Sequence, residues 1–142
     1  MATKLKDANT PLELEELFLK TVPVLGTIVL VGAVIQLILG FVVAGGMDAL
    51  VGVHMALGVL GLILVIALTA IAFRAKTATL YSRITIILLT LVVIAQVGLG
   101  VQLFNGADAL AVSHEANGFV IIILALLMGG ITFWSSKRKI KA

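Results

Sequence analysis

The chain has no cysteine, only two prolines and few charged residues, which occupy 12% of its 142 positions. Without cysteine it cannot form a disulfide framework, a thiolate zinc site or a cysteine-ligated iron–sulfur cluster. Apolar residues make up 61% of the sequence, whereas soluble domains contain roughly 45–50%. This composition excludes a disordered chain and predicts a membrane protein rather than a soluble enzyme.

The positive charges divide the chain. All ten lysines and arginines lie in three short regions: Lys4, Lys6 and Lys20; Arg74, Lys76 and Arg83; and Lys137, Arg138, Lys139 and Lys141. The two apolar stretches between them have about 50 residues each, enough for two membrane spans of about 20 residues. Turns with Gly and Asp at 44–48 and 104–108 divide each stretch. We predict an all-α membrane protein, an antiparallel four-helix bundle with spans near 24–44, 49–73, 82–104 and 109–134.

The same charges predict the orientation in a cell membrane. By the positive-inside rule, both termini and the central loop are cytoplasmic, and the two turns face outside. We expect one membrane domain, with a cytoplasmic segment 1–23, hairpins 24–73 and 84–134, and a basic cytoplasmic tail 135–142. Thr10, Pro11 and Glu13 predict a short amphipathic helix that ends near Pro23 rather than a cleaved signal peptide. The basic flanks indicate contact with the lipid bilayer and not with nucleic acid.

The two halves of the chain repeat each other with an offset of 60 residues. Fourteen positions between 36 and 73 are identical in the second copy. Those that are not common apolar residues pair as Gln36 with Gln96, Gly40 with Gly100, Gly46 with Gly106, Asp48 with Asp108, His54 with His114 and Gly58 with Gly118. The fold is therefore expected to be two tandem helical hairpins, parallel repeats about an axis along the membrane normal. Asp48 and Asp108 are expected to be helix N-caps.

The repeat places the only two histidines, His54 and His114, at equal depth, about 9 Å below the outer turns at 1.5 Å per residue. If the second and fourth helices face each other, both imidazoles point to one central position. Ionisable groups inside a membrane are costly and usually functional. This pattern indicates two axial ligands of one haem iron, since bundle interiors commonly hold cofactors.

Matched glycines and glutamines accompany the histidines. Gly58 and Gly118 lie one turn beyond each His, where the lack of a side chain would let a flat macrocycle approach. Gly40 and Gly100 would relieve crowding from the first and third helices, and Gln36 and Gln96 could orient an imidazole. With no cation expected at the outer turns, the haem propionates would depend on Gln102, Asn105, Asn117 and backbone amides. Alternatively, the His and Gln side chains only bond neighbouring helices, and the glycines are a packing device.

The segments around the histidines resemble the haem A synthase family. Gln96-Val97-Gly98-Leu99-Gly100 followed by 109–114 (ALAVSH) is similar to the second hairpin of one half of such a protein, and 53–58 (VHMALG) is similar to the first. The resemblance covers roughly residues 24–134 and implies a four-helix half that binds haem between its second and fourth helices. It also implies that His54 and His114 are the ligands. The acidic residue that precedes the His in the family's catalytic half is replaced here by Val51-Gly52-Val53.

The resulting expectation is an integral membrane b-type cytochrome that holds one haem b per chain and transfers single electrons. Its partner would be a quinol or another respiratory-chain component. A second hypothesis is a minimal haem-modifying enzyme similar to haem A synthase, which would act as a single chain or as a homodimer. A third is a cofactor-free structural or assembly subunit, in which the histidines only form hydrogen bonds between helices.

Overall fold

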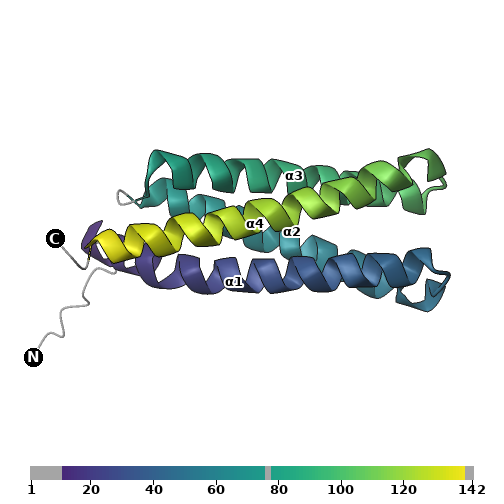
Figure 1. The fold of residues 1–142 in the computed structure, drawn as a ribbon, viewed down its shortest axis with the longest axis horizontal. Coiled ribbons are helices and arrows are strands. Elements are labelled where there is room, and N and C mark those ends of the chain that lie inside the picture. The colour runs from purple at the N-terminus through teal and green to yellow at the C-terminus, as the bar shows by residue number, and fades with distance from the viewer. Residues whose placement is uncertain (1–10, 76–77, 140–142) are drawn as a thin grey trace, which may run out of the picture.

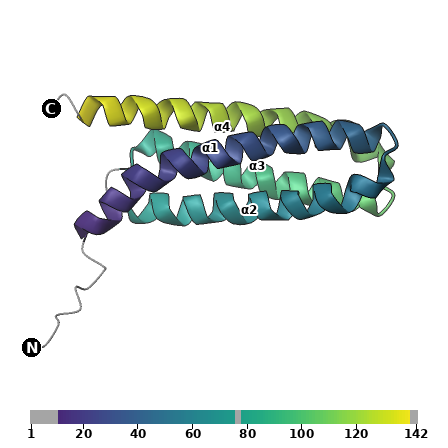
Figure 2. The ribbon, with the colours of Figure 1, turned by 90° about the horizontal axis from the view of Figure 1, so that it is seen from below.

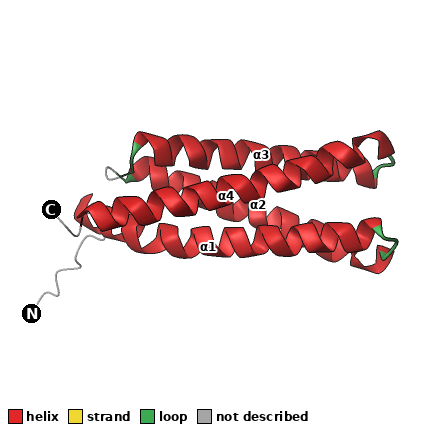
Figure 3. Ribbon diagram, in the orientation of Figure 1, coloured by secondary structure: helices red, strands yellow, loops and turns green. Residues whose placement is uncertain are grey.

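The protein is described by a computed structural model that covers residues 11–75 and 78–139, with side chains for 20–75 and 78–131. Four long helices make up this part of the chain: α1 (Pro11–Ala44), α2 (Val51–Arg74), α3 (Leu80–Phe104) and α4 (Ala111–Lys139). Short 3₁₀ helices, η1 (Asp48–Leu50) and η2 (Asp108–Leu110), precede α2 and α4, and the described residues contain no strand (Figure 3). The predicted all-α bundle is confirmed. Four segments are long and apolar enough to span a membrane: Lys20–Ala44 within α1, Asp48–Arg74 over η1 and α2, Leu80–Phe104 as α3, and Asp108–Ile131 over η2 and part of α4.

The helices form a closed ring in which each contacts two neighbours. Contacts join α1 to α2, α2 to α3, α3 to α4 and α4 to α1. The remaining pairs, α1 with α3 and α2 with α4, lie on the diagonals, and their described residues have no Cα atoms within 8 Å of each other. In Figure 1, α4 lies in front of α2, and both tight turns are at one end, called here the hairpin end. The start of α1, the end of α2, the start of α3 and the end of α4 lie at the other end, called here the loop end (Figure 2).

The two turns at the hairpin end have the same backbone structure. Gly46 and Gly106 adopt φ angles of +98° and +90°, a region that a residue with a Cβ rarely enters. Their amides donate to the carbonyls of Val43 and Leu103, each at 2.9 Å. The prediction that Asp48 and Asp108 are N-caps is wrong. Each aspartate is the first residue of a 3₁₀ helix whose N-cap residue precedes it and provides no side-chain capping bond.

The structure also differs from expectation at Pro23. The predicted N-terminal segment is helical, but it does not end there, because α1 continues through Pro23 as one helix of 34 residues. Pro23 has no N–H, so the backbone carbonyl one turn earlier in the helix loses its usual donor. The carbonyl of Pro23 itself accepts a side-chain bond from Thr27 Oγ1 at 2.9 Å. The side chains of residues 11–19, on which the amphipathic character depends, and that of Trp134 lie outside the described set.

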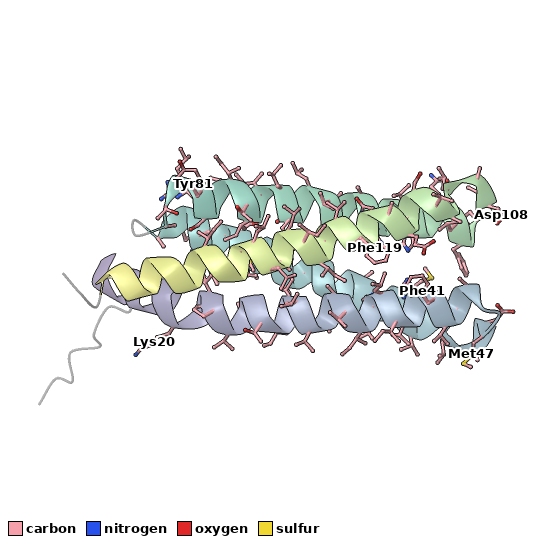
Figure 4. All side chains as sticks on the ribbon, viewed as in Figure 1. Lys20, Phe41, Met47, Tyr81, Asp108 and Phe119 are labelled. Carbon is pink, nitrogen blue, oxygen red and sulfur yellow. The ribbon has the colours of Figure 1, made fainter. Side chains whose placement is uncertain are left out.

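The tightly packed core occupies only the loop half of the bundle. Its largest fully buried side chains are Leu68, Ile86, Leu89, Val22 and Val65. In that half, Thr69 and Thr90 also join α2 to α3 through their hydroxyls at 2.7 Å. Residues 30–64 and 94–120, which form the hairpin half, include none that is fully buried. Most large apolar side chains point outward (Figure 4), as expected where lipid rather than water surrounds the helices.

Candidate functional site

His54 and His114 meet at the centre of the hairpin half. They lie on α2 and α4, the helices on one diagonal of the ring, and are the only side chains described here that join these two helices through a ring contact. Their ring centroids are 6.0 Å apart and their planes are inclined by 68°. Both side chains are half-buried. The equal depth that the repeat predicts is therefore accompanied by direct contact across the axis.

Gly40 and Gly100 form the walls behind the two imidazoles. A Cβ at Gly40 would lie 3.5 Å from His54 Cε1, and one at Gly100 would lie 3.2 Å from His114 Cε1. The first distance is an ordinary contact, whereas the second is tighter than most carbon contacts in proteins. The absence of a side chain on α1 and α3 thus lets each ring lie against the preceding helix. That these glycines also relieve crowding around a bound macrocycle stays a prediction.

Gly58 and Gln36 form a second pair, between α1 and α2. A Cβ at Gly58 would come to 3.0 Å from the Gln36 Nε2 atom. From that position, Gln36 Nε2 donates to the backbone carbonyl of His54 at 2.8 Å. The space above Gly58 is therefore occupied by an amide that ties α1 to the segment carrying His54. The sequence predicts that Gly58 and Gln36 belong to the site, but it does not show that they touch each other.

The corresponding pair in the second repeat, Gly118 and Gln96, has a different bonding pattern. A Cβ at Gly118 would lie 3.5 Å from Gln96 Nε2, but this amide reaches the His114 ring, with 3.2 Å between the two Nε2 atoms. Asn117 Nδ2 donates to Gln96 Oε1 at 2.7 Å and to the Val92 carbonyl at 2.9 Å. All eight predicted site residues thus lie in two related clusters around the paired rings.

Several polar atoms of this site have no partner. Among the described residues, four buried side-chain nitrogen or oxygen atoms lack a hydrogen bond, and three of them are Gln36 Oε1, His54 Nδ1 and His114 Nδ1. Buried polar groups are almost always satisfied, so unpaired ones often mark a missing water, ion or ligand. Their concentration here, in the half of the bundle without fully buried residues, indicates that this region accommodates a further group.

The donor set fits a metal that needs only two protein ligands. Two imidazoles on one metal have ring centroids about 6 Å apart, because each metal–nitrogen bond is about 2 Å and a ring atom lies about 1 Å from its centroid. The observed separation is 6.0 Å. No third His, Asp or Glu joins the pair among the described residues, whereas structural zinc takes four ligands. In haem the porphyrin supplies the other four nitrogens, so residues on α2 and α4 fit this group.

No charged side chain is buried beside the two histidines among the described residues. Glu115, next to His114, is exposed, as its position in the helix predicts. Two of the three amides considered for haem propionates have other partners. Asn105 Nδ2 donates to the Val101 carbonyl at 2.9 Å, and Asn117 is turned inward. Gln102 is exposed near the turn.

An aromatic pair joins α1 and α4 at the residues that follow Gly40 and Gly118, and the sequence did not predict it. Phe41 on α1 and Phe119 on α4 have ring centroids 6.4 Å apart (Figure 4). The equivalent positions on α3 and α2 hold Val101 and Val59. The signal that could have found this pair is the same one that marks Asn117, whose counterpart is Leu57: a departure from the repeat. The backbone of the two repeats is symmetric, but the α1–α4 side of the bundle has two phenylalanines where the α2–α3 side has two valines.

Comparison with family models, with curated proteins and with solved structures gives no match for this chain. The functional interpretation of the site consequently depends on its own residues and geometry.

Proposed function

We propose that this protein is an integral membrane b-type cytochrome that binds one haem between α2 and α4 and transfers single electrons. The observation that carries the proposal is the pairing of His54 and His114 across the diagonal, with ring centroids 6.0 Å apart. The backbones of α2 and α4 stay apart at this point, since none of their described Cα atoms lie within 8 Å of each other. Two histidines without other candidate ligands fit axial coordination of a haem iron.

When bound, haem supplies an iron that changes between the ferric and ferrous states by one electron. The residues of this chain have separate tasks around it. His54 and His114 would hold the iron through their ring nitrogens. Gly40 and Gly100 leave room for their rings, and the Gln36 bond to the His54 carbonyl holds α1 against α2 at this level.

The charges of the described residues support an orientation for this cytochrome. Lys20, Arg74 and Arg83 lie at the loop end, whereas the hairpin end has Asp48 and Asp108. The positive-inside rule then places the loop end and both termini in the cytoplasm and the haem toward the outer face. A quinol or a respiratory-chain protein at that face would be the electron partner, and a second copy of the chain could complete a homodimer similar to the two halves of haem A synthase.

The test is a reduced-minus-oxidised optical spectrum of the purified protein, with a pyridine haemochrome assay for stoichiometry. We expect a low-spin b-type spectrum with about one haem per chain, because the chain contains a single pair of axial ligands. His54→Ala and His114→Ala should each abolish that spectrum or convert it to a five-coordinate form. Ser113→Ala is the matched control, since Ser113 adjoins His114 but is exposed. A normal spectrum in either His variant contradicts the ligand assignment, and a colourless protein that takes up no haem contradicts the function.

A cofactor-free structural subunit is the second candidate, and one observation favours it. The 6.0 Å separation and 68° inclination of the rings also suit direct edge-to-face packing of two aromatic rings. Together with the Gln36 and Gln96 bonds, such packing would join all four helices without a ligand. The same spectrum decides between the two candidates, because only the cytochrome is coloured.

A further inference from the structure

The two histidines differ because of one residue that breaks the repeat. Asn117 lies on α4, three residues after His114, and its counterpart three residues after His54 is Leu57. Asn117 Nδ2 donates to the Val92 carbonyl at 2.9 Å and to Gln96 Oε1 at 2.7 Å. Leucine can form neither bond, so an amide of this kind is present only in the second repeat.

These bonds determine which atom each amide presents. A backbone carbonyl only accepts hydrogen bonds, so the Asn117 atom that faces Val92 is its NH₂ group. The second hydrogen of that group goes to Gln96, which must offer its oxygen there. The NH₂ group of Gln96 consequently faces His114, 3.2 Å from Nε2. Since an amide nitrogen only donates, His114 Nε2 must accept, and the ring hydrogen of neutral His114 is on Nδ1.

His54 has no such constraint. Gln36 Nε2 donates to the His54 backbone carbonyl at 2.8 Å and not to the ring. Among the described residues, no hydrogen bond reaches the His54 imidazole, and its Nδ1 is buried and unpaired. One ring therefore has its accepting nitrogen covered by an amide, whereas the other has both nitrogens free of hydrogen bonds.

We propose that Asn117 and Gln96 form an amide latch on His114: Asn117 orients Gln96, and the Gln96 amide donates to the Nε2 lone pair that a metal would use. Resting on the proposed cytochrome function, this makes His54 the open ligand and His114 a ligand that must first displace Gln96. With haem bound, a small neutral diatomic ligand would therefore compete more easily with His114 than with His54. Losing one hydrogen bond weakens the competing ligation about fivefold, since such a bond contributes about 1 kcal/mol net.

The latch can be tested without any cofactor. The probe is nitrogen NMR of the full chain labelled with ¹⁵N-histidine, in haem-free lipid nanodiscs at a pH where both rings are neutral. We expect His114 to show one tautomer, protonated on Nδ1, and His54 to show a mixture. Asn117→Leu should convert His114 to a mixture as well. Leu57→Asn, the reciprocal exchange on α2, is the control and should leave His114 unchanged. Equal mixtures at both rings of the wild-type protein, or an unaltered His114 in Asn117→Leu, overturn the latch.

The consequence for ligand binding is measured with carbon monoxide on the reduced, haem-loaded protein. Asn117→Leu and Gln96→Leu free His114 to ligate, so both should bind carbon monoxide about fivefold more weakly than the wild type. Ser113→Ala should bind it as the wild type does. Equal affinities in all four proteins overturn the proposed competition with His114. Failure of every protein to take up haem overturns the cytochrome function instead, and the NMR measurement then decides the latch alone.

Discussion

A substitution at Gly58 can show whether this glycine is needed for helix packing or only for the approach of a flat macrocycle. A methyl group at this position would lie 3.0 Å from Gln36 Nε2, the atom that donates to the His54 carbonyl at 2.8 Å. Gly58→Ala should therefore displace the amide and break the bond between α1 and α2. Gly61 is the matched control on the same helix, because a Cβ there would meet nothing within 4 Å.

The expected magnitude follows from these contacts. Replacing glycine by alanine within a helix adds up to about 1 kcal/mol of stability, and this gain is common to both variants. Gly58→Ala additionally loses an interhelical hydrogen bond and leaves a buried amide without a partner, which costs about 1–2 kcal/mol in a membrane protein. Gly58→Ala should thus be less stable than Gly61→Ala by about 1–2 kcal/mol.

The assay is reversible unfolding of the haem-free protein in mixed micelles, followed by circular dichroism. If Gly58 instead serves only to let a flat macrocycle approach α2, both variants should unfold with the same free energy, and only the haem affinity of Gly58→Ala should fall. Equal unfolding free energies would therefore refute the packing argument. A difference in the cofactor-free state would show that Gly58 is required by the fold before any ligand binds.

Three further predictions concern the core, the ligands and the topology. Leu68→Ala, at a side chain with 0% exposure, should lower the unfolding free energy by about 2 kcal/mol, near the low end for buried leucines, because lipid rather than water surrounds the bundle; an unchanged value would contradict its place in the core. Restoring His54→Gly or His114→Gly with free imidazole should return the low-spin spectrum, and a spectrum insensitive to imidazole would argue against axial ligation. Since the chain has no cysteine, Met47→Cys should react with a membrane-impermeant thiol reagent from outside the cell and Tyr81→Cys only after the membrane is opened; the reverse pattern would invert the orientation.

The sequence by itself determined the helices, the turns and the depth of the site. Runs of apolar residues longer than a bilayer requires, interrupted by Gly and Asp, permit helices and little else in lipid. The agreement is close at the hairpin end, where the spans predicted to end at 44 and 104 end at Ala44 and Phe104. The 60-residue repeat also predicted the eight candidate site residues, which the structure brings together, because chance rarely aligns His, Gln and Gly residues in one register.

Local rules were less reliable at helix starts and at proline. Asp48 and Asp108 suit an N-cap by residue type, but one 3₁₀ turn places each of them inside the element. Pro23 suits a helix end, yet α1 passes through it with a Thr27 side-chain bond to its carbonyl. In both places, the neighbouring backbone decided between conformations that the residue itself allows.

Only the tertiary structure decided which side chains meet. The helices are apolar on all sides, so hydropathy does not show which face of each points to the axis. The ring of contacts puts α2 and α4 on a diagonal and brings His54 to His114. It also pairs Gly58 with Gln36 and turns Asn117 inward to Gln96. These pairings depend on the rotation of each helix about its axis, which packing against two neighbours determines and which no single segment of the sequence encodes.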